Sequence, residues 1–187
     1  MATILILYST VDGHTRTICE RIGRVVEAAG HSVTLRRMEE ADGVNPADYD
    51  RIVIGASIRY GKHRPSVFEF IRKYHALLES RPNALFSVNI VARKPEKNRP
   101  ETNPYFRKFL RQIRWKPQLV EVFAGRLDYP SYRPLDRLAI RFIMWITRGP
   151  TDPNAVIEFT DWTRVDEFAR KIAALQAGQN SSDEVKS

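Results

Sequence analysis

The amino-acid sequence predicts an α/β domain in which a parallel sheet is wound with helices on both faces. Short apolar runs alternate along the chain with segments whose apolar residues recur at helical spacing. The runs are nearly continuous in apolar character, as expected of strands covered on both faces. With 187 residues, 43% of them hydrophobic, the chain is long enough for one domain with a substantial core. These observations together favour a single doubly wound domain.

The first strand and the first helix are expected within the first thirty residues. Residues 4–8 form a short apolar run, which we interpret as a strand. After a polar loop, apolar residues follow at helical spacing up to Gly30, which suits a helix end. These helical positions are Ile18, Ile22, Val25, Val26 and Ala29.

Four further strands are predicted at residues 32–38, 51–56, 84–91 and 120–125. Between the third and the fourth, helical spacing continues from Val67 to Leu78 after Pro65, a residue that suits a first helical turn. The segment 106–113 has the same spacing, and residues 165–172 mark a closing helix. The five strands therefore alternate with helices, as in a parallel sheet.

The alternation is interrupted between the fifth strand and the closing helix, where we expect an insertion at about residues 127–154. It includes a proline-bounded helix at about 134–147, and a strand-like piece follows at 155–160. We assign residues 1–176 to one domain and residues 177–187 to a polar C-terminal tail.

Composition restricts the kind of site and the cellular setting. Cys19 is the single cysteine, which excludes an internal disulfide and a multi-cysteine metal site. The four histidines show no metal-ligand spacing, so we expect no metal. Because the first strand begins immediately after Met1-Ala2, without a basic leader or a cleavage pattern, we expect a cytoplasmic protein without a signal peptide.

Most of the net charge of +8 comes from one region of the chain. Residues 93–116 contain nine lysines and arginines against two glutamates. Such a region is either a solvated face or a surface for an acidic ligand, an anionic membrane or a nucleic acid. The remaining chain is close to neutral.

A polar loop, STVDGHT, follows the first strand at residues 9–15. Ligands of open parallel sheets bind beyond the carboxyl ends of the strands, where a loop leads into the next helix. Backbone amides there attract a phosphate, Gly13 permits close approach, and the Thr10 and Thr15 hydroxyls can donate to phosphate oxygens. The loop matches neither GxxxxGK(S/T) nor GxGxxG, which disfavours a nucleoside triphosphate or dinucleotide site. An ordinary helix start is the alternative.

Residues 10–15, TVDGHT, resemble the phosphate loop S/T-x-T-G-x-T of flavodoxins, with Asp12 where flavodoxins have threonine. We expect Asp12 to turn towards the helix amides as a cap, since a carboxylate would repel a phosphate. The segments VIGASIRYG at 53–61 and SVNIVARKPEK at 87–97 are similar to those of the quinone-dependent protoporphyrinogen IX dehydrogenases. Further likeness lies at 124–125, at 129–137 and in FTDW at 159–162, so that it covers roughly residues 3–175.

The resemblance implies a flavodoxin-like fold with strand order 2-1-3-4-5 and an FMN cofactor. The FMN phosphate would lie on the first loop, and the isoalloxazine ring between the loops after the third and fourth strands. The implied cofactor-binding residues are Ser9, Thr10, Val11, Asp12, Gly13, His14, Thr15, Ser57, Ile58, Arg59, Tyr60, Gly61, Asn89, Val91, Ala92, Arg93 and Lys94. Tyr60 is either a ring against the flavin or an ordinary surface aromatic.

The resemblance also implies an activity. No protein side chain carries hydride well, so the redox chemistry would be that of the cofactor. FMN would oxidise protoporphyrinogen IX to protoporphyrin IX in successive two-electron steps, and a membrane quinone, menaquinone or ubiquinone, would reoxidise it. Arg59, Arg93 and Lys94 are candidates for attracting the substrate's propionates or stabilising the reduced flavin, or are solvated charges.

The predicted helix in the insertion is basic and amphipathic. On a helical wheel Arg137, Arg141 and Arg148 form a narrow stripe, and apolar residues that include Phe142 and Trp145 occupy much of the rest. We expect a peripheral contact with the inner face of the cell membrane through Arg137, Arg141, Phe142 and Trp145. Packing on the domain, covering the porphyrinogen, or self-association into a homo-oligomer are the alternatives.

Two other functions compete with this reading. A flavodoxin-type electron carrier, or a quinone reductase without porphyrinogen activity, would use the same flavin site, but such carriers are typically acidic and lack a basic apolar helix. A nucleic-acid-binding module would use the basic region, with aromatics interleaved on an open sheet face. Tyr105, Phe106 and Phe109 support it only faintly, because they are better explained as core. We therefore expect no nucleic-acid partner.

Overall fold

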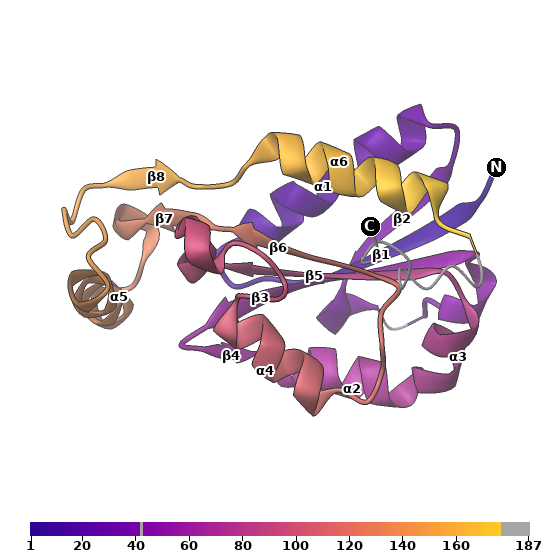
Figure 1. The fold of residues 1–187 in the computed structure, drawn as a ribbon, viewed down its shortest axis with the longest axis horizontal. Helices are drawn as coiled ribbons and strands as arrows, with labels where there is room; N and C mark the ends of the chain where they lie inside the picture. The colour runs from indigo at the N-terminus through magenta and orange to yellow at the C-terminus, as the bar shows by residue number, and fades with distance from the viewer. Residues whose placement is uncertain (42, 177–187) are drawn as a thin grey trace, which may run out of the picture.

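The computed structural model describes residues 1–41 and 43–176, so the predicted tail at 177–187 lies outside the described residues. Five parallel strands form the sheet in the order β2-β1-β3-β5-β6, which confirms the predicted doubly wound fold and its 2-1-3-4-5 strand order. Figure 1 shows this sheet between two layers of helices. The strands are β1 (Thr3–Ser9), β2 (Ser32–Arg37), β3 (Arg51–Arg59), β5 (Asn83–Asn89) and β6 (Leu119–Ala124).

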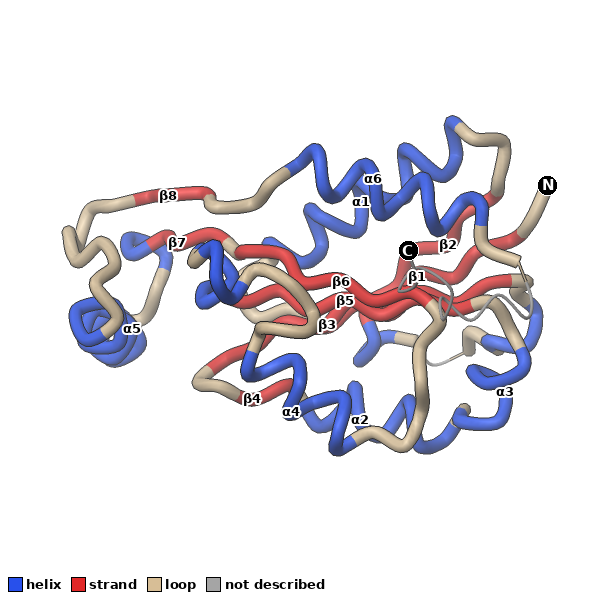
Figure 2. Tube along the Cα trace, in the orientation of Figure 1, coloured by secondary structure: helices blue, strands red, loops and turns tan. Residues whose placement is uncertain are grey.

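Helices cover both faces of the sheet because its strands are apolar on both sides. On one face, α1 (His14–Ala28) and α6 (Trp162–Ala174) bury side chains such as Ile18 and Phe168. On the other face lie α2 (Pro65–Lys73), α3 (His75–Ser80) and α4 (Pro104–Gln112). All seven residues of β5 are buried, including the polar Asn83, Ser87 and Asn89, as expected of a central strand covered on both faces. The two helical layers and the central strands are separated clearly in Figure 2.

Short 3-10 segments connect several of these elements. They are η1 (Met38–Glu40), η2 (Pro46–Asp48), η3 (Ile90–Arg93), η4 (Pro95–Lys97) and η5 (Tyr129–Ser131). The second strand therefore ends at Arg37, before η1, and the fourth strand gives way to η3 at Ile90.

Two elements between the third and fourth strands differ from the sequence expectation. The expected strand 51–56 continues to Arg59 and turns back through a short antiparallel strand, β4 (Lys62–His63). Tyr60 and Gly61 make the turn with φ angles of 50° and 75°, as a tight hairpin requires. The single expected helix is divided at Tyr74, which ends α2 and begins α3.

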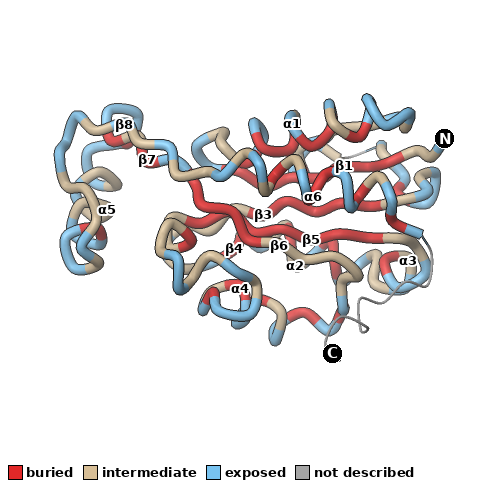
Figure 3. The backbone as a smooth tube through the Cα atoms, turned by 45° about the horizontal axis from the view of Figure 1, so that its top comes forward, coloured by how far each residue is buried: buried red, intermediate tan, exposed pale blue. Residues whose placement is uncertain are grey.

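The insertion forms its own small unit at the carboxyl ends of the strands. Strand β7 (Arg126–Asp128) pairs antiparallel with β8 (Val156–Glu158), and α5 (Pro134–Ile146) lies between them in the chain. Its small core consists of Leu127, Tyr129, Tyr132 and Met144. Figure 1 shows α5 at one end of the molecule, away from the main helical layers, and Figure 3 shows it largely exposed while the strands of the sheet are buried.

Candidate functional site

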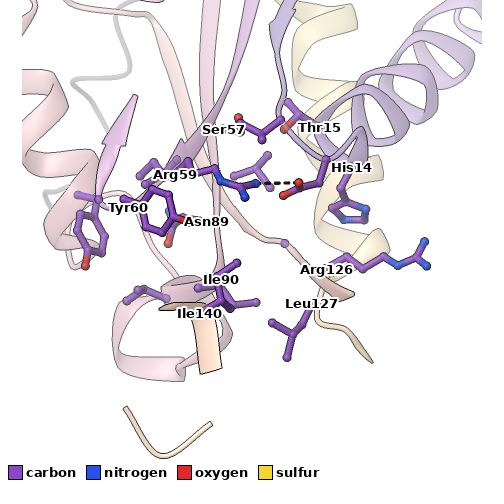
Figure 4. A pocket seen from close by; sticks show the side chains of 18 of the residues that line it. His14, Thr15, Ser57, Arg59, Tyr60, Asn89, Ile90, Arg126, Leu127 and Ile140 are labelled. Carbon is purple, nitrogen blue, oxygen red and sulfur yellow. Dashed lines mark hydrogen bonds and ion pairs between the residues drawn. The ribbon is translucent and has the colours of Figure 1, made fainter. Parts of the chain in front are cut away.

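A pocket of about 540 Å³ opens at the carboxyl ends of β1, β3 and β5, where ligands of open parallel sheets bind. Four segments of the main domain contribute most of its lining there: the loop at 10–15, the β3–β4 turn at 57–62, the end of β5 at 88–91, and α4 through Tyr105 and Lys108. The insertion contributes residues of β7 and α5 to its remaining wall. Figure 4 shows His14 and Thr15 across this pocket from Tyr60.

The loop after β1 has the geometry of an anion site. Gly13 is the N-cap of α1 in a left-handed conformation, φ 82°, which glycine adopts without strain. The Gly13 amide donates to Thr10 Oγ1 over 3.0 Å, which fixes the turn, and Thr10 and Thr15 are buried. The first amides of a helix lack intrahelical acceptors and lie at its positive end. This loop can therefore receive a phosphate on backbone amides and threonine hydroxyls.

Asp12 does not cap the helix, contrary to the sequence expectation. Its carboxylate instead accepts a hydrogen bond from Arg59 Nη1 at 2.8 Å. Arg59 also pairs with Asp136 of α5 at 2.6 Å, and Tyr60 donates its hydroxyl to Asp136. One guanidinium thus joins the β1 loop, the end of β3 and the insertion helix. In Figure 4 a dashed line marks the contact that the Arg59 guanidinium makes across the pocket with the β1 loop.

These contacts determine the charge state of the acidic and basic groups around the pocket. The hydrogen bond from Tyr60, with a smaller contribution from the Arg59 charge, holds the pKa of Asp136 below its usual value. Half-buried His14 contacts Thr160 Oγ1 through Nε2 at 2.6 Å, and burial lowers its pKa. Asp136 therefore carries charge at neutral pH, and His14 is neutral.

Two polar atoms at the pocket fit a bound planar group. Ser57 and Asn89 both line the pocket. The atoms Ser57 Oγ and Asn89 Nδ2 are buried and have no hydrogen-bond partner within residues 1–41 and 43–176. Asn89 Oδ1 is already engaged, because it accepts from the Ala92 amide at 3.0 Å and from Asn103 at 3.1 Å. A buried polar group without a partner is costly, so these two atoms are suited to a ligand with donors and acceptors on its edge.

The insertion supplies an apolar wall. Leu127 and Met144 are almost fully buried, while Ile140 and Ile143 of α5 complete the surface that faces the pocket. Figure 4 shows Ile90, Leu127 and Ile140 together on one side of the cavity. The site thus combines a phosphate-type loop, unsatisfied polar atoms and an apolar wall large enough for a flat organic ligand.

Most of the sequence-predicted site residues come together at this pocket. Those that line it are Thr10, Val11, Asp12, His14, Thr15, Ser57, Ile58, Arg59, Tyr60, Gly61, Asn89 and Val91. Five others do not contribute side chains to its lining: Ser9, Gly13, Ala92, Arg93 and Lys94.

The Arg93 guanidinium is held by hydrogen bonds within the protein and is not a free charge at the pocket. It donates to the Ile90 carbonyl at 3.1 Å and to the Thr147 carbonyl and hydroxyl at 3.2 and 3.0 Å. These bonds tie η3 to the C-terminus of α5. Arg93 therefore supports the wall of the pocket from behind.

Several lining residues were missed from the sequence. They are Lys62, Val88, Ile90, Tyr105, Lys108, Gly125, Arg126, Leu127, Tyr132, Ile140, Ile143 and Met144. Lys62 follows the Tyr60-Gly61 turn directly, so recognition of the hairpin would have found it. The residues of α4 and the insertion reach the pocket only through tertiary packing, for which the sequence pattern contains no local signal.

Comparison with known proteins assigns the family. A model of the flavodoxin domain matches residues 5–154. A protein of Escherichia coli strain K12, named protoporphyrinogen IX dehydrogenase (quinone), is 44% identical over 171 residues, which are 91% of this chain and 94% of that protein. This chain belongs to that dehydrogenase family. The protein of the same name from Leishmania major is 45% identical over 172 residues, 91% of this chain and 74% of its own length.

Solved structures support the fold at much lower sequence identity. Flavodoxin 1 from Bacillus cereus superposes with a TM-score of 0.53 at 11% identity, covering 92% of this chain and 97% of that one. A flavodoxin from the domain Archaea gives a TM-score of 0.51 at 13% identity, covering 92% and 96%. Such similarity establishes the flavodoxin fold, and with the domain match it implies a flavin cofactor.

Proposed function

We propose that this chain is an FMN-dependent enzyme that oxidises protoporphyrinogen IX to protoporphyrin IX and passes the electrons to a membrane quinone, menaquinone or ubiquinone. The observation that carries the proposal is a pocket of about 540 Å³ that joins an anion-binding loop to an apolar wall from the insertion. Near full-length identity of 44% to a protein named protoporphyrinogen IX dehydrogenase (quinone) supports the same conclusion.

FMN fits the chain's own donors. Its phosphate would be held by the amides around Gly13 and the hydroxyls of Thr10 and Thr15, at the positive end of α1. Ser57 and Asn89 offer unpaired buried polar atoms for the flavin ring, which would lie between the β3–β4 turn and the end of β5. Bound FMN supplies the two-electron redox chemistry that amino-acid side chains lack.

The residues around the pocket would orient the substrate and exclude water. Ile140, Ile143 and Leu127 present apolar surface to the macrocycle, and burial beside α5 reduces the solvent around the reacting groups. We assign Arg59 a positioning role, because both Asp12 and Asp136 already neutralise it and its bonds hold α5 over the pocket. Arg93 holds the other end of α5 through Thr147. We also propose that Lys94, in the loop after η3, attracts the anionic substrate through its charge.

A membrane contact through α5 would give this enzyme access to quinone. Five large apolar side chains of α5 are exposed to solvent. Their exposed fractions are 83% for Leu135, 66% for Leu138, 58% for Phe142, 69% for Trp145 and 59% for Ile146. None of the helices in the described part of the chain, α5 included, has both the length and the apolar character to cross a bilayer. The proposed location is accordingly peripheral, on the cytoplasmic face of the cell membrane.

The arginines of α5 are arranged differently from the helical-wheel expectation. Arg137 donates to the carbonyls of Pro130 and Tyr132, and Arg141 donates to that of Thr151. Arg148 lies beyond the last helical residue with a φ of 55°. The exposed cations beside the apolar face are Arg133 and Arg148, so we propose these, with Phe142 and Trp145, as the contact with anionic lipid.

Reconstitution with FMN tests the proposed function. Purified protein loaded with FMN should convert protoporphyrinogen IX to fluorescent protoporphyrin IX under anaerobic conditions when a short-chain quinone is supplied, and should show a flavin absorption spectrum. The protein without FMN, and FMN without the protein, are the controls. Flavin binding without porphyrin formation would leave a flavodoxin-type electron carrier or quinone reductase, and failure to bind any flavin would refute both.

A further inference from the structure

We propose that Lys62 and Lys108 form a carboxylate-binding edge of the pocket, which receives the anionic side chains of the substrate. The inference rests on the proposed function, since it specifies how a porphyrinogen is oriented in that site. Both lysines line the pocket and both are exposed. Within the described part of the chain, neither ammonium group has an ion pair or a hydrogen bond. Two uncompensated ammonium groups at a cavity are suited to a dicarboxylate.

The local structure brings the two lysines to the same wall. Lys62 follows the Tyr60-Gly61 turn and lies opposite Arg59 in the β3–β4 ladder. A Cβ atom on Gly61 would be 3.0 Å from the Tyr105 ring, so the turn packs directly on α4. Lys108 is three residues after Tyr105 in this helix, which places both on one helical face. The turn and the face of α4 therefore present their ammonium groups to one side of the cavity.

The other cations around the pocket are already compensated. Arg59 is bound by two carboxylates, those of Asp12 and Asp136. Arg126, which also lines the pocket, pairs with Asp128 at 2.9 Å. Among the charged lining residues within 1–41 and 43–176, only Lys62 and Lys108 lack a counter-charge. Excess positive potential in the cavity is thus concentrated at this edge.

The position of this edge separates it from the phosphate loop. Strand β4 and α4 lie on the opposite side of the sheet from α1, as Figure 1 shows. In Figure 4, Tyr60, which precedes the β4 strand, is across the pocket from His14 and Thr15 at the start of α1. A flavin phosphate at α1 leaves the two lysines free for a second anionic group, that of the substrate.

The apolar wall of the pocket is complementary to the side of the porphyrinogen that carries no propionates. Protoporphyrinogen IX carries two propionates on one side of the macrocycle and vinyl and methyl groups on the other. Propionates at Lys62 and Lys108 would leave the apolar side for the wall formed by Leu127, Ile140 and Ile143. The two kinds of surface fix one orientation of the macrocycle.

Charge-removing variants, Lys62→Gln, Lys108→Gln and the double variant, test this assignment with protoporphyrinogen IX and with its dimethyl ester as substrates. Each single change should raise KM for the dicarboxylate roughly five-fold, and the double change roughly twenty-fold, at low salt. The kcat and the flavin content should stay near those of the wild-type protein. With the diester the variants and the wild-type protein should have the same KM, because the charges that the lysines bind are gone.

Two controls separate a specific edge from a general loss of positive charge. Lys116→Gln removes an exposed lysine of the same basic region that does not line the pocket, and it should leave KM unchanged. Lys62→Arg with Lys108→Arg retains both charges and should restore most of the affinity. An unchanged KM for the dicarboxylate in the double variant, or an equal rise with the diester, would overturn the inference. Absence of oxidation of both substrates by the flavin-loaded wild-type protein would refute the proposed function instead.

Discussion

The sheet domain and the insertion helix α5 are both rich in large apolar side chains, but they use them in opposite ways. Every residue of β5 is buried, because helices cover both faces of the strand and β3 and β6 flank it. Of the thirteen residues of α5, only Met144 is buried, and Trp145 is 69% exposed. Apolar surface stabilises the fold where neighbours cover it, and it forms a binding surface where one side of a helix has no neighbour.

Replacing one phenylalanine by alanine in each region should give the largest difference between them in the free energy of unfolding. Phe86 is fully buried and packs edge-on against Phe123 and Phe168, with ring centroids 5.5 and 5.9 Å away. Phe86→Ala should lower the free energy of unfolding by about 4 kcal/mol through lost burial and a cavity. Phe142→Ala should change it by less than about 0.5 kcal/mol, since that side chain is exposed. Denaturant unfolding of both variants measures the contrast, and equal losses would mean that α5 is part of the core.

Burial in the sheet domain should also make it sensitive to acid. His63 is buried, contacts Ser87 at 3.0 Å and stacks on Phe109, and burial lowers its pKa to about 4. The unfolded chain, with a histidine pKa near 6.5, binds the proton more tightly. Stability should therefore fall as pH decreases from about 6.5 to about 4, by roughly 3 kcal/mol in total from this group.

The His63→Asn variant isolates that contribution. The wild-type protein and the variant share all other titrating groups, so the difference between their unfolding free energies should shrink or change sign across this pH window. A difference that is constant from pH 7 to pH 4 would mean that His63 is protonated equally in the folded and unfolded chain.

Two glycines with the same left-handed backbone conformation distinguish the proposed phosphate loop from the rest of the sheet domain. Gly13 and Gly30 have φ angles of 82° and 87°, and a Cβ atom at either would meet no atom within 4 Å. Valine at either position should cost about 1–2 kcal/mol of stability for the left-handed conformation. Only Gly13→Val should weaken FMN binding, by roughly ten-fold or more, because the loop amides then shift. Flavin titration of both variants decides this, and equal affinities would exclude the loop as the phosphate site.

The ion pair between Arg59 and Asp136 connects the sheet domain to α5, and removing it should have the smallest effect of the changes considered. Asp136→Asn removes a carboxylate that joins α5 to Arg59 and Tyr60, and amide hydrogen exchange within α5 should become a few-fold faster. Asp166→Asn is the matched control, because it removes an equivalent partner of Arg21 within the sheet domain. That control should leave exchange in α5 unchanged. Identical exchange in α5 for all three proteins would show that the bridge does not hold the helix.

Much of the fold could be predicted from the sequence because strands and helices leave a local signal in apolar spacing. The end of β3 was missed, since Ser57 and Arg59 are polar residues in a strand that extends past the covered sheet. The division at Tyr74 was also missed, because the apolar spacing continues through it.

The candidate site was only partly predictable, for a different physical reason. The loop at 10–15 and the β3–β4 turn are contiguous segments with recognisable patterns, and they do line the pocket. Asp12 was expected to cap α1, but its partner Arg59 is 47 residues away in the chain. A helical wheel identified a stripe of arginines on α5 without specifying which side faces the domain, and Arg141 faces a backbone carbonyl. Contacts of this kind depend on tertiary packing.

Vesicle co-sedimentation with parallel quinone assays tests most directly whether the two regions have separate tasks. In the Phe142→Ser, Trp145→Ser double variant, loss of exposed apolar surface should release the protein from vesicles containing anionic lipid. Oxidation with a short, soluble quinone should remain at the wild-type rate, because neither residue lines the pocket, while oxidation with vesicle-held quinone should fall. A folded double variant that binds vesicles as tightly as the wild-type protein, or that loses activity with the soluble quinone to the same extent, would contradict this division between a flavin-binding sheet domain and a membrane-binding helix.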